Sequence, residues 1–171
     1  MKRIATLLVF GVMIFAVSAF GQNKYIGMKG CTCHKLEKNG NQVKIWEGSD
    51  HAKAYKTLLT DKANEIAKKK GLSKPAAESP ECLKCHVAGY GKPQDKTYKI
   101  DEGVQCESCH GAASAYKTIH SKPENKEKAK AAGLVIGDEK TCKECHNSDS
   151  PTFKGFNFKE AMAKIAHPLK K

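Results

Sequence analysis

Three stretches of the sequence share the pattern Cys-x-x-Cys-His, in which two thiols lie three positions apart and an imidazole follows directly. Thiols at this spacing can add to the two vinyl groups of one haem, and the next histidine can reach the iron. The pattern occupies residues 82–86, 106–110 and 142–146, and a shortened version, Cys-Thr-Cys-His, occupies residues 31–34. Numbered in chain order, these four clusters predict four covalent haem c groups. The expected attachment residues are Cys31, Cys33, Cys82, Cys85, Cys106, Cys109, Cys142 and Cys145, and the expected proximal iron ligands are His34, His86, His110 and His146.

Disulfide bonding and zinc binding are the alternative roles for these cysteines. Exported chains often carry a disulfide framework, and paired Cys-x-x-Cys elements can build tetrathiolate zinc sites. Neither role needs a histidine directly after the second cysteine of a pair. All four clusters have that histidine, and no cysteine is left over. The pattern therefore favours haem attachment.

The first cluster departs from the usual spacing, because Gly30 stands where the first cysteine is expected. Cys31 can still reach its vinyl carbon through a distorted turn, or the haem is attached by Cys33 alone. A free Cys31 thiol is the third arrangement. We expect a haem at this cluster, with its mode of attachment left open.

Three histidines lie outside the clusters, at His51, His120 and His167. In a chain with several haems, such histidines are expected to be sixth ligands of the irons. Met28 and Met162 can also ligate iron, but the histidines otherwise have no role. Four proximal and three spare histidines leave one iron without a sixth protein ligand.

Three expected helices position the spare histidines. One begins near Ser49 or Asp50, runs over residues 50–70 with His51 at its start, and ends at Gly71. A polar helix begins with Pro123 and ends near residue 133, shortly after His120. A third covers residues 158–167, where proline at 168 blocks further extension.

The N-terminus has the pattern of a signal peptide. Lys2 and Arg3 precede an almost wholly apolar stretch over residues 4–20, and small residues follow. Cleavage after residue 21 leaves a tetrahaem domain over residues 22–171, without a stable membrane span. The competing interpretation is an uncleaved anchor, since the apolar stretch approaches the roughly 20 residues that span a bilayer. Export to the periplasm also fits the cysteines.

Composition predicts a mainly α-helical, loop-rich fold in which the haems form the core. The expected mature chain has 150 residues, about 37 for each haem, and aromatic residues make up only 7% of the sequence. Four large apolar cofactors therefore replace a protein core of ordinary size.

The basic charge indicates a protein partner rather than nucleic acid. The formal net charge is +12, or +10 without Lys2 and Arg3, and Arg3 is the only arginine. Nucleic-acid readers generally use the bidentate guanidinium group. A surface whose cations are all lysines suits long-range steering toward redox proteins with an acidic docking surface.

Several stretches resemble the tetrahaem cytochrome c-554 family. They are residues 33–35, 46–54 (Trp-Glu-Gly-Ser-Asp-His-Ala-Lys-Ala), 82–91, 103–111 (Gly-Val-Gln-Cys-Glu-Ser-Cys-His-Gly) and 150–162. The resemblance implies a helical fold with closely stacked haem pairs, three haems with two histidine ligands, and one five-coordinate haem on His86. It further implies that His120 pairs with His34, His51 with His110, and His167 with His146.

The expected function is electron transfer between redox partners. In the family that the chain resembles, electrons arrive from hydroxylamine oxidation and leave to another cytochrome. The alternative is a reductase or gas-binding protein that acts on nitric oxide, or a similar small molecule, at the five-coordinate haem. No catalytic acid or base can be assigned to that site from the sequence.

Overall fold

The chain is mainly helical and loop-rich, as expected, in the computed structural model, which describes residues 22–167. The expected signal peptide lies outside the described residues. The α-helices are α1 (Gln42–Glu47), α2 (Ala54–Leu58), α3 (Asp61–Lys69), α4 (Pro80–His86), α5 (Cys106–His110), α6 (Lys126–Ala131), α7 (Glu139–Lys143) and α8 (Phe158–Ile165). Short 3₁₀-helices cover Met28–Lys35, Glu37–Asn39, His51–Lys53, Ala76–Glu78, Ile100–Glu102 and Pro123–Asn125. Within the described residues, β-pairing is limited to one bridge between Tyr25 and Gln94.

The expected continuous helix over residues 50–70 is wrong. The chain forms a 3₁₀ turn at His51–Lys53, then α2, and then α3 after a break. Thr60 causes the break by adopting an extended conformation, and its hydroxyl accepts a hydrogen bond from the Ala63 N–H at 3.3 Å. Threonine is a favourable N-cap because this bond satisfies an unpaired helix donor.

The other two expected helices are present in shorter form. The polar helix begins with a 3₁₀ turn at Pro123–Asn125, continues as α6, and is followed by Gly133 with a positive φ of 102°. Helix α8 ends at Ile165, so His167 lies just beyond the helix rather than within it.

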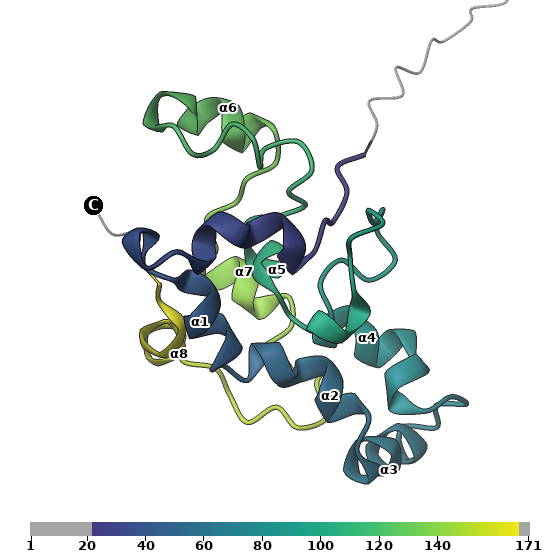
Figure 1. The fold of residues 1–171 in the computed structure, drawn as a ribbon. Coiled ribbons are helices and arrows are strands. Elements are labelled where there is room, and N and C mark those ends of the chain that lie inside the picture. The colour runs from purple at the N-terminus through teal and green to yellow at the C-terminus, as the bar shows by residue number, and fades with distance from the viewer. Residues whose placement is uncertain (1–21, 168–171) are drawn as a thin grey trace, which may run out of the picture.

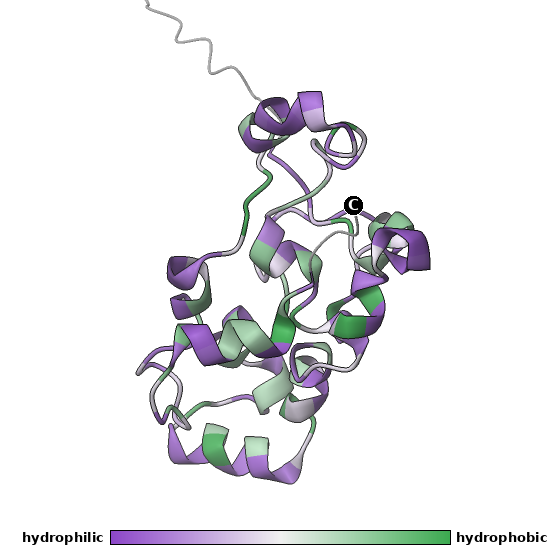
Figure 2. Cartoon of the chain, turned by 90° about the vertical axis from the view of Figure 1, so that its left-hand side faces the viewer, coloured by the Kyte–Doolittle hydropathy of each residue, from purple (hydrophilic) through white to green (hydrophobic). Residues whose placement is uncertain are grey.

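The described residues contain two small clusters of buried apolar side chains. One lies under α2, α3 and α4, and the other joins the N-terminal segment to residues 113–134. Helices α3 and α6 lie at opposite ends of the molecule, with α5 and α7 between them (Figure 1). Figure 2 shows that hydrophilic residues dominate the two outer helices.

Among residues 22–167, no helix is both long enough and apolar enough to cross a membrane.

Candidate haem-binding sites

Six of the seven histidines lie in three close pairs. The ring centres of His34 and His120 are 5.8 Å apart, those of His51 and His146 are 6.0 Å apart, and those of His110 and His167 are 6.0 Å apart. Two imidazoles on opposite sides of one metal ion, with bonds of about 2 Å each, have ring centres about 6 Å apart. Each pair joins one cluster histidine to one spare histidine and has the spacing for a shared iron.

The structure corrects two of the three expected pairings. His120 lies beside His34 as the resemblance implied, but His51 lies beside His146 and His167 lies beside His110. The backbone and the ring of His51 lie near different clusters. The carbonyl of His51 accepts a hydrogen bond from Val104, just before the third cluster, at 3.1 Å. The ring of His51 nevertheless points to the fourth cluster.

Most of the histidine rings are oriented through Nδ1, which leaves Nε2 available for a metal. Metal-binding histidines usually donate the second ring N–H to a carbonyl or carboxylate, and this bond fixes the tautomer. The five contacts are His34 Nδ1 with Gln42 Oε1 (3.2 Å), His86 with the Ala54 carbonyl (2.8 Å), His110 with Val135 (2.9 Å), His120 with Tyr116 (3.2 Å) and His167 with Ile165 (2.7 Å). The four backbone acceptors have no signal in the sequence.

Burial favours the neutral form of two of these rings. Burial lowers the pKa of His51, and the neighbouring His146 lowers it further. Burial also lowers the pKa of His110, although its bond to Val135 acts in the opposite direction. A neutral imidazole is the form that binds a metal.

His86 is the exception among the cluster histidines. Its ring is held by the Ala54 carbonyl, and among the described residues no second imidazole stacks on it or meets it edge-on. The second cluster lies instead on the apolar cluster under α2, α3 and α4, against which Cys82 packs.

Thiols of different clusters lie near one another. The thiols of Cys31 and Cys106 lie close together, and their interaction lowers the pKa of Cys31 and raises that of Cys106. The thiols of Cys85 and Cys145 interact in the same way, which lowers the pKa of Cys85 to about 7. Burial raises the pKa of Cys109, and Cys142 adds to the effect. The first cluster therefore adjoins the third, the third adjoins the fourth, and the fourth adjoins the second.

The local fold of the first cluster differs from that of the other three. Residues 28–35 are 3₁₀-helical with a kink at Cys31 (φ −105°, ψ 23°), whereas the second and third clusters lie on α4 and α5 and the fourth begins on α7 and continues into a turn. The kink separates Cys31 from the helical turn that carries Cys33 and His34. Cys31 is half-buried against Cys106, whereas Cys33 is exposed.

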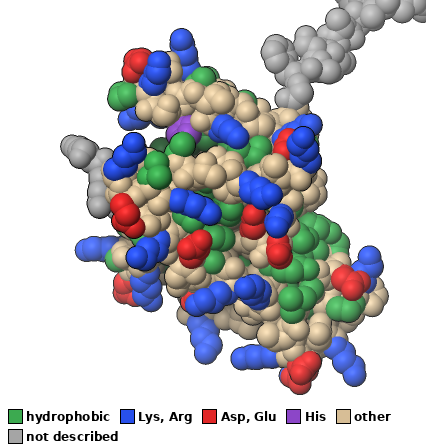
Figure 3. All heavy atoms as spheres, viewed as in Figure 1, with side chains coloured by type: hydrophobic (Ala, Val, Ile, Leu, Met, Phe, Trp, Pro, Cys, Tyr) green, Lys and Arg blue, Asp and Glu red, His purple; other side chains and the backbone are tan. Residues whose placement is uncertain are grey.

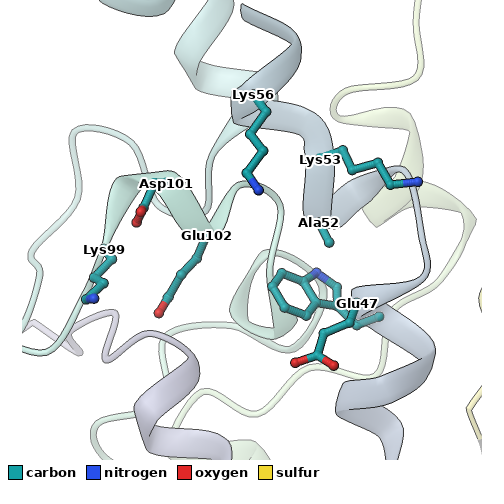
Figure 4. Close-up of a pocket in the computed structure, with 8 residues that line it drawn as sticks. Glu47, Ala52, Lys53, Lys56, Lys99, Asp101 and Glu102 are labelled. Atoms are coloured by element: carbon teal, nitrogen blue, oxygen red, sulfur yellow. The ribbon is translucent and has the colours of Figure 1, made fainter. Parts of the chain in front are cut away.

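The large surface hollow of the described chain is separate from these sites. It encloses about 460 Å³ between α1, α2 and the 3₁₀ turn at Ile100–Glu102, and Trp46 and Ala52 form its apolar lining. Charged side chains of both signs surround it, and Lys56 extends into the hollow while Lys53 points away (Figure 4). No cysteine or histidine lines it.

Sequence reasoning missed the most deeply buried polar group near the clusters. Gln105 and Glu107, which flank Cys106, are 2% and 1% exposed. The feature of the sequence that could have revealed it is the position of Glu107, a carboxylate between the two cysteines of the third cluster. Phe156, near the C-terminus, stacks on the His146 ring at 4.8 Å between ring centres.

The donor set fits covalent haem better than disulfides or zinc. All eight cysteines are free thiols, and the described residues contain no group of three or more His, Cys, Asp or Glu side chains placed to hold a metal ion directly. The hydroxyl of Ser108, inside the third cluster, is buried without a hydrogen-bond partner. Thiols beside oriented imidazoles are the groups that a c-type haem requires.

Comparisons with known proteins agree with this geometry. The family model described as cytochrome c554 and c-prime matches residues 30–111. Cytochrome c-554 of Nitrosomonas europaea is 32% identical over 148 residues, which cover 75% of this chain and 60% of that protein. The chain thus matches somewhat less than two thirds of the length of this relative. No solved structure gives a match. Together, the cluster motifs, the paired imidazoles and these matches show that the chain is a member of the cytochrome c-554 family.

Proposed function

We propose that the protein is an exported, periplasmic tetrahaem c-type cytochrome that passes electrons between redox partners through closely packed haems. The observation that carries the proposal is the set of three imidazole pairs, each spaced for one iron. Haem iron stores one electron by changing between its ferric and ferrous states, at a potential that ligands and burial adjust. Residues 22–171 form the mature domain after removal of the signal peptide.

The chain holds each haem through one cluster. In the second, third and fourth clusters, both cysteines attach the haem and the following histidine binds the iron. The spare histidines would supply the sixth ligands, His120 together with His34, His51 with His146, and His167 with His110. The distances and the Nδ1 contacts above support this assignment.

At the first cluster, we assign the attachment to Cys33 alone. Cys33 precedes His34 directly, as the second cysteine does in every other cluster. Cys31 lies at a kink in its 3₁₀ segment, and its thiol lies close to that of Cys106. Cys31 then remains a free thiol between the first and third clusters.

The short separations between thiols of different clusters support a connected path for electrons. The path runs from the first cluster to the third, then to the fourth and the second. Clusters in contact hold their haems close together, which favours transfer through the protein. The chain's task is to fix these groups and to exclude water from their edges.

The surface supports steering toward an acidic partner. Lysine side chains are spread over the face shown in Figure 3 rather than gathered in one patch. The sequence has 30 basic and 18 acidic residues. A distributed positive surface raises the rate of encounter with an acidic protein and loses this effect at high salt.

A second candidate function rests on His86. Since no imidazole of the described residues pairs with it, an iron held at the second cluster would have an open coordination position. A small molecule such as nitric oxide can bind such an iron, which makes reduction or gas sensing the alternative to simple electron transfer.

One set of measurements on the loaded protein tests both functions. Intact mass is expected to give four haems, and alkylation after denaturation is expected to label one thiol, at Cys31. Carbon monoxide is expected to change the reduced spectrum of about one haem in four. Fewer than four haems contradicts the tetrahaem assignment, and no labelled thiol contradicts attachment by Cys33 alone. Catalytic consumption of nitric oxide by the reduced protein favours the second function.

A further inference from the structure

Glu107 is a buried carboxylate whose partners are all hydrogen-bond donors. The side chain is 1% exposed. Its oxygens accept bonds from the Ile26 N–H at 2.9 and 3.0 Å, the Gly27 N–H at 2.8 Å and the Ala113 N–H at 2.8 Å. The side-chain amide of Gln105 donates a further bond at 2.9 Å. None of the ion pairs in the described part of the chain includes Glu107.

This environment is suited to a negative charge. A buried charge is tolerated only when hydrogen bonds replace its lost hydration, and successive backbone N–H groups form anion-binding concavities. The donors around Glu107 are neutral, so they stabilise the charge without cancelling it. A net negative charge therefore remains inside the protein at this position.

The carboxylate joins the first and third clusters. It lies within the third, directly after Cys106, and it holds the backbone of residues 26 and 27, which lead into the first. The next N–H, that of Met28, is held by Glu102 at 2.9 Å. The sulfur of Met28 lies 3.6 Å from that of Cys106. The backbone N–H groups of residues 26, 27 and 28 thus donate hydrogen bonds to the carboxylates of Glu107 and Glu102. Both carboxylates lie beside the contact between the first and third clusters.

We propose that Glu107 is a positioning residue that locks the first cluster onto the third, and that its buried charge keeps the reduction potentials of the haems at these two clusters low. This inference rests on the proposed function, because it requires haems there. A fixed negative charge stabilises the oxidised form of a nearby redox group, and its effect is large where water does not screen it.

The test compares three variants by spectroelectrochemical titration. Glu107→Gln keeps the shape and removes the charge, and we expect two of the four midpoint potentials to rise. Glu107→Asp keeps the charge, and we expect potentials close to those of the unmodified protein. Glu144→Gln is the matched control, since it removes one charge from an exposed position inside the fourth cluster.

Haem content by intact mass is measured first, so that a failure of the proposed function is recognised separately. With four haems present, potentials that rise in Glu107→Gln no more than in Glu144→Gln overturn the inference. A purely structural role would lower haem loading or thermal stability in both Glu107 variants without a selective rise. If Glu107→Gln does not accumulate with four haems, Glu107→Asp decides. It is compared with Glu107→Ala: higher potentials for two haems in the alanine variant support the inference, and equal potentials in the two variants contradict it.

Discussion

The second and fourth clusters both lie on or beside short helices, yet the protein packs around them very differently. Helix α4, which carries the second cluster, buries Leu83 against apolar residues of α2 and α3. Helices α7 and α8, which flank the fourth cluster, bury no residue. Conversely, the His146 ring has two ring neighbours, His51 and Phe156, whereas the His86 ring has no imidazole partner.

The difference indicates two ways of holding a haem. The second cluster is supported by an apolar core that the chain supplies itself, and its histidine needs no opposing ligand to be oriented. At the fourth cluster the chain supplies rings and thiols but little buried apolar surface. The haem must provide that surface, because helices of five to eight residues are marginal without packing. Three predictions test this contrast.

The largest effect is expected from removing the fourth haem. In a Cys142→Ala, Cys145→Ala variant, amide exchange in residues 138–167 should approach the rates of an unfolded peptide, since little else packs against that segment. In the matched Cys82→Ala, Cys85→Ala variant, residues 54–87 should keep most of their protection. Hydrogen exchange followed by mass spectrometry measures both. Equal protection of the two segments would contradict the contrast.

The next effect concerns the ligand of the fourth haem. His51→Ala should open the iron held by His146, so that carbon monoxide reacts with about two haems instead of about one. His167→Ala should give the same number but open the iron held by His110. When His51→Ala is added to the variant lacking Cys142 and Cys145, no further reactive haem should appear. An additional haem that reacts with carbon monoxide in this combined variant would show that His51 is a ligand of another iron.

The smallest effect compares two packed side chains. Leu83 is 4% exposed, and Leu83→Ala should lower the free energy of unfolding by about 2–5 kcal/mol, because it leaves a cavity in a core that cannot fully collapse. Phe156→Ala removes one ring stack and should cost about 0.5–1.5 kcal/mol beyond the lost burial. Urea unfolding of the oxidised proteins measures both. A larger cost for Phe156 would mean that the fourth cluster has a core of its own.

The sequence predicted the starts and ends of some helices, but it did not predict the break between α2 and α3. Prolines and glycines place the starts and ends of α6 and α8 within a few residues. The break at Thr60 was not predicted, because apolar residues at helical spacing continue across it. A threonine competes with a continuous helix only when its hydroxyl can cap the next one, as it does at the Ala63 N–H.

The sequence by itself determined the chemistry of the sites. The spacing of two cysteines and a histidine within five residues is local, so it predicts the group that binds, the number of clusters and the proximal ligands. The histidine count likewise predicts one iron without a sixth ligand. The tertiary structure decided which distant rings and charges meet. The pairing of His51 with His146, and the burial of Glu107 against residues 26 and 27, join segments about 80 or more residues apart. Contacts at that separation depend on the packing of the whole chain, and no local pattern encodes them.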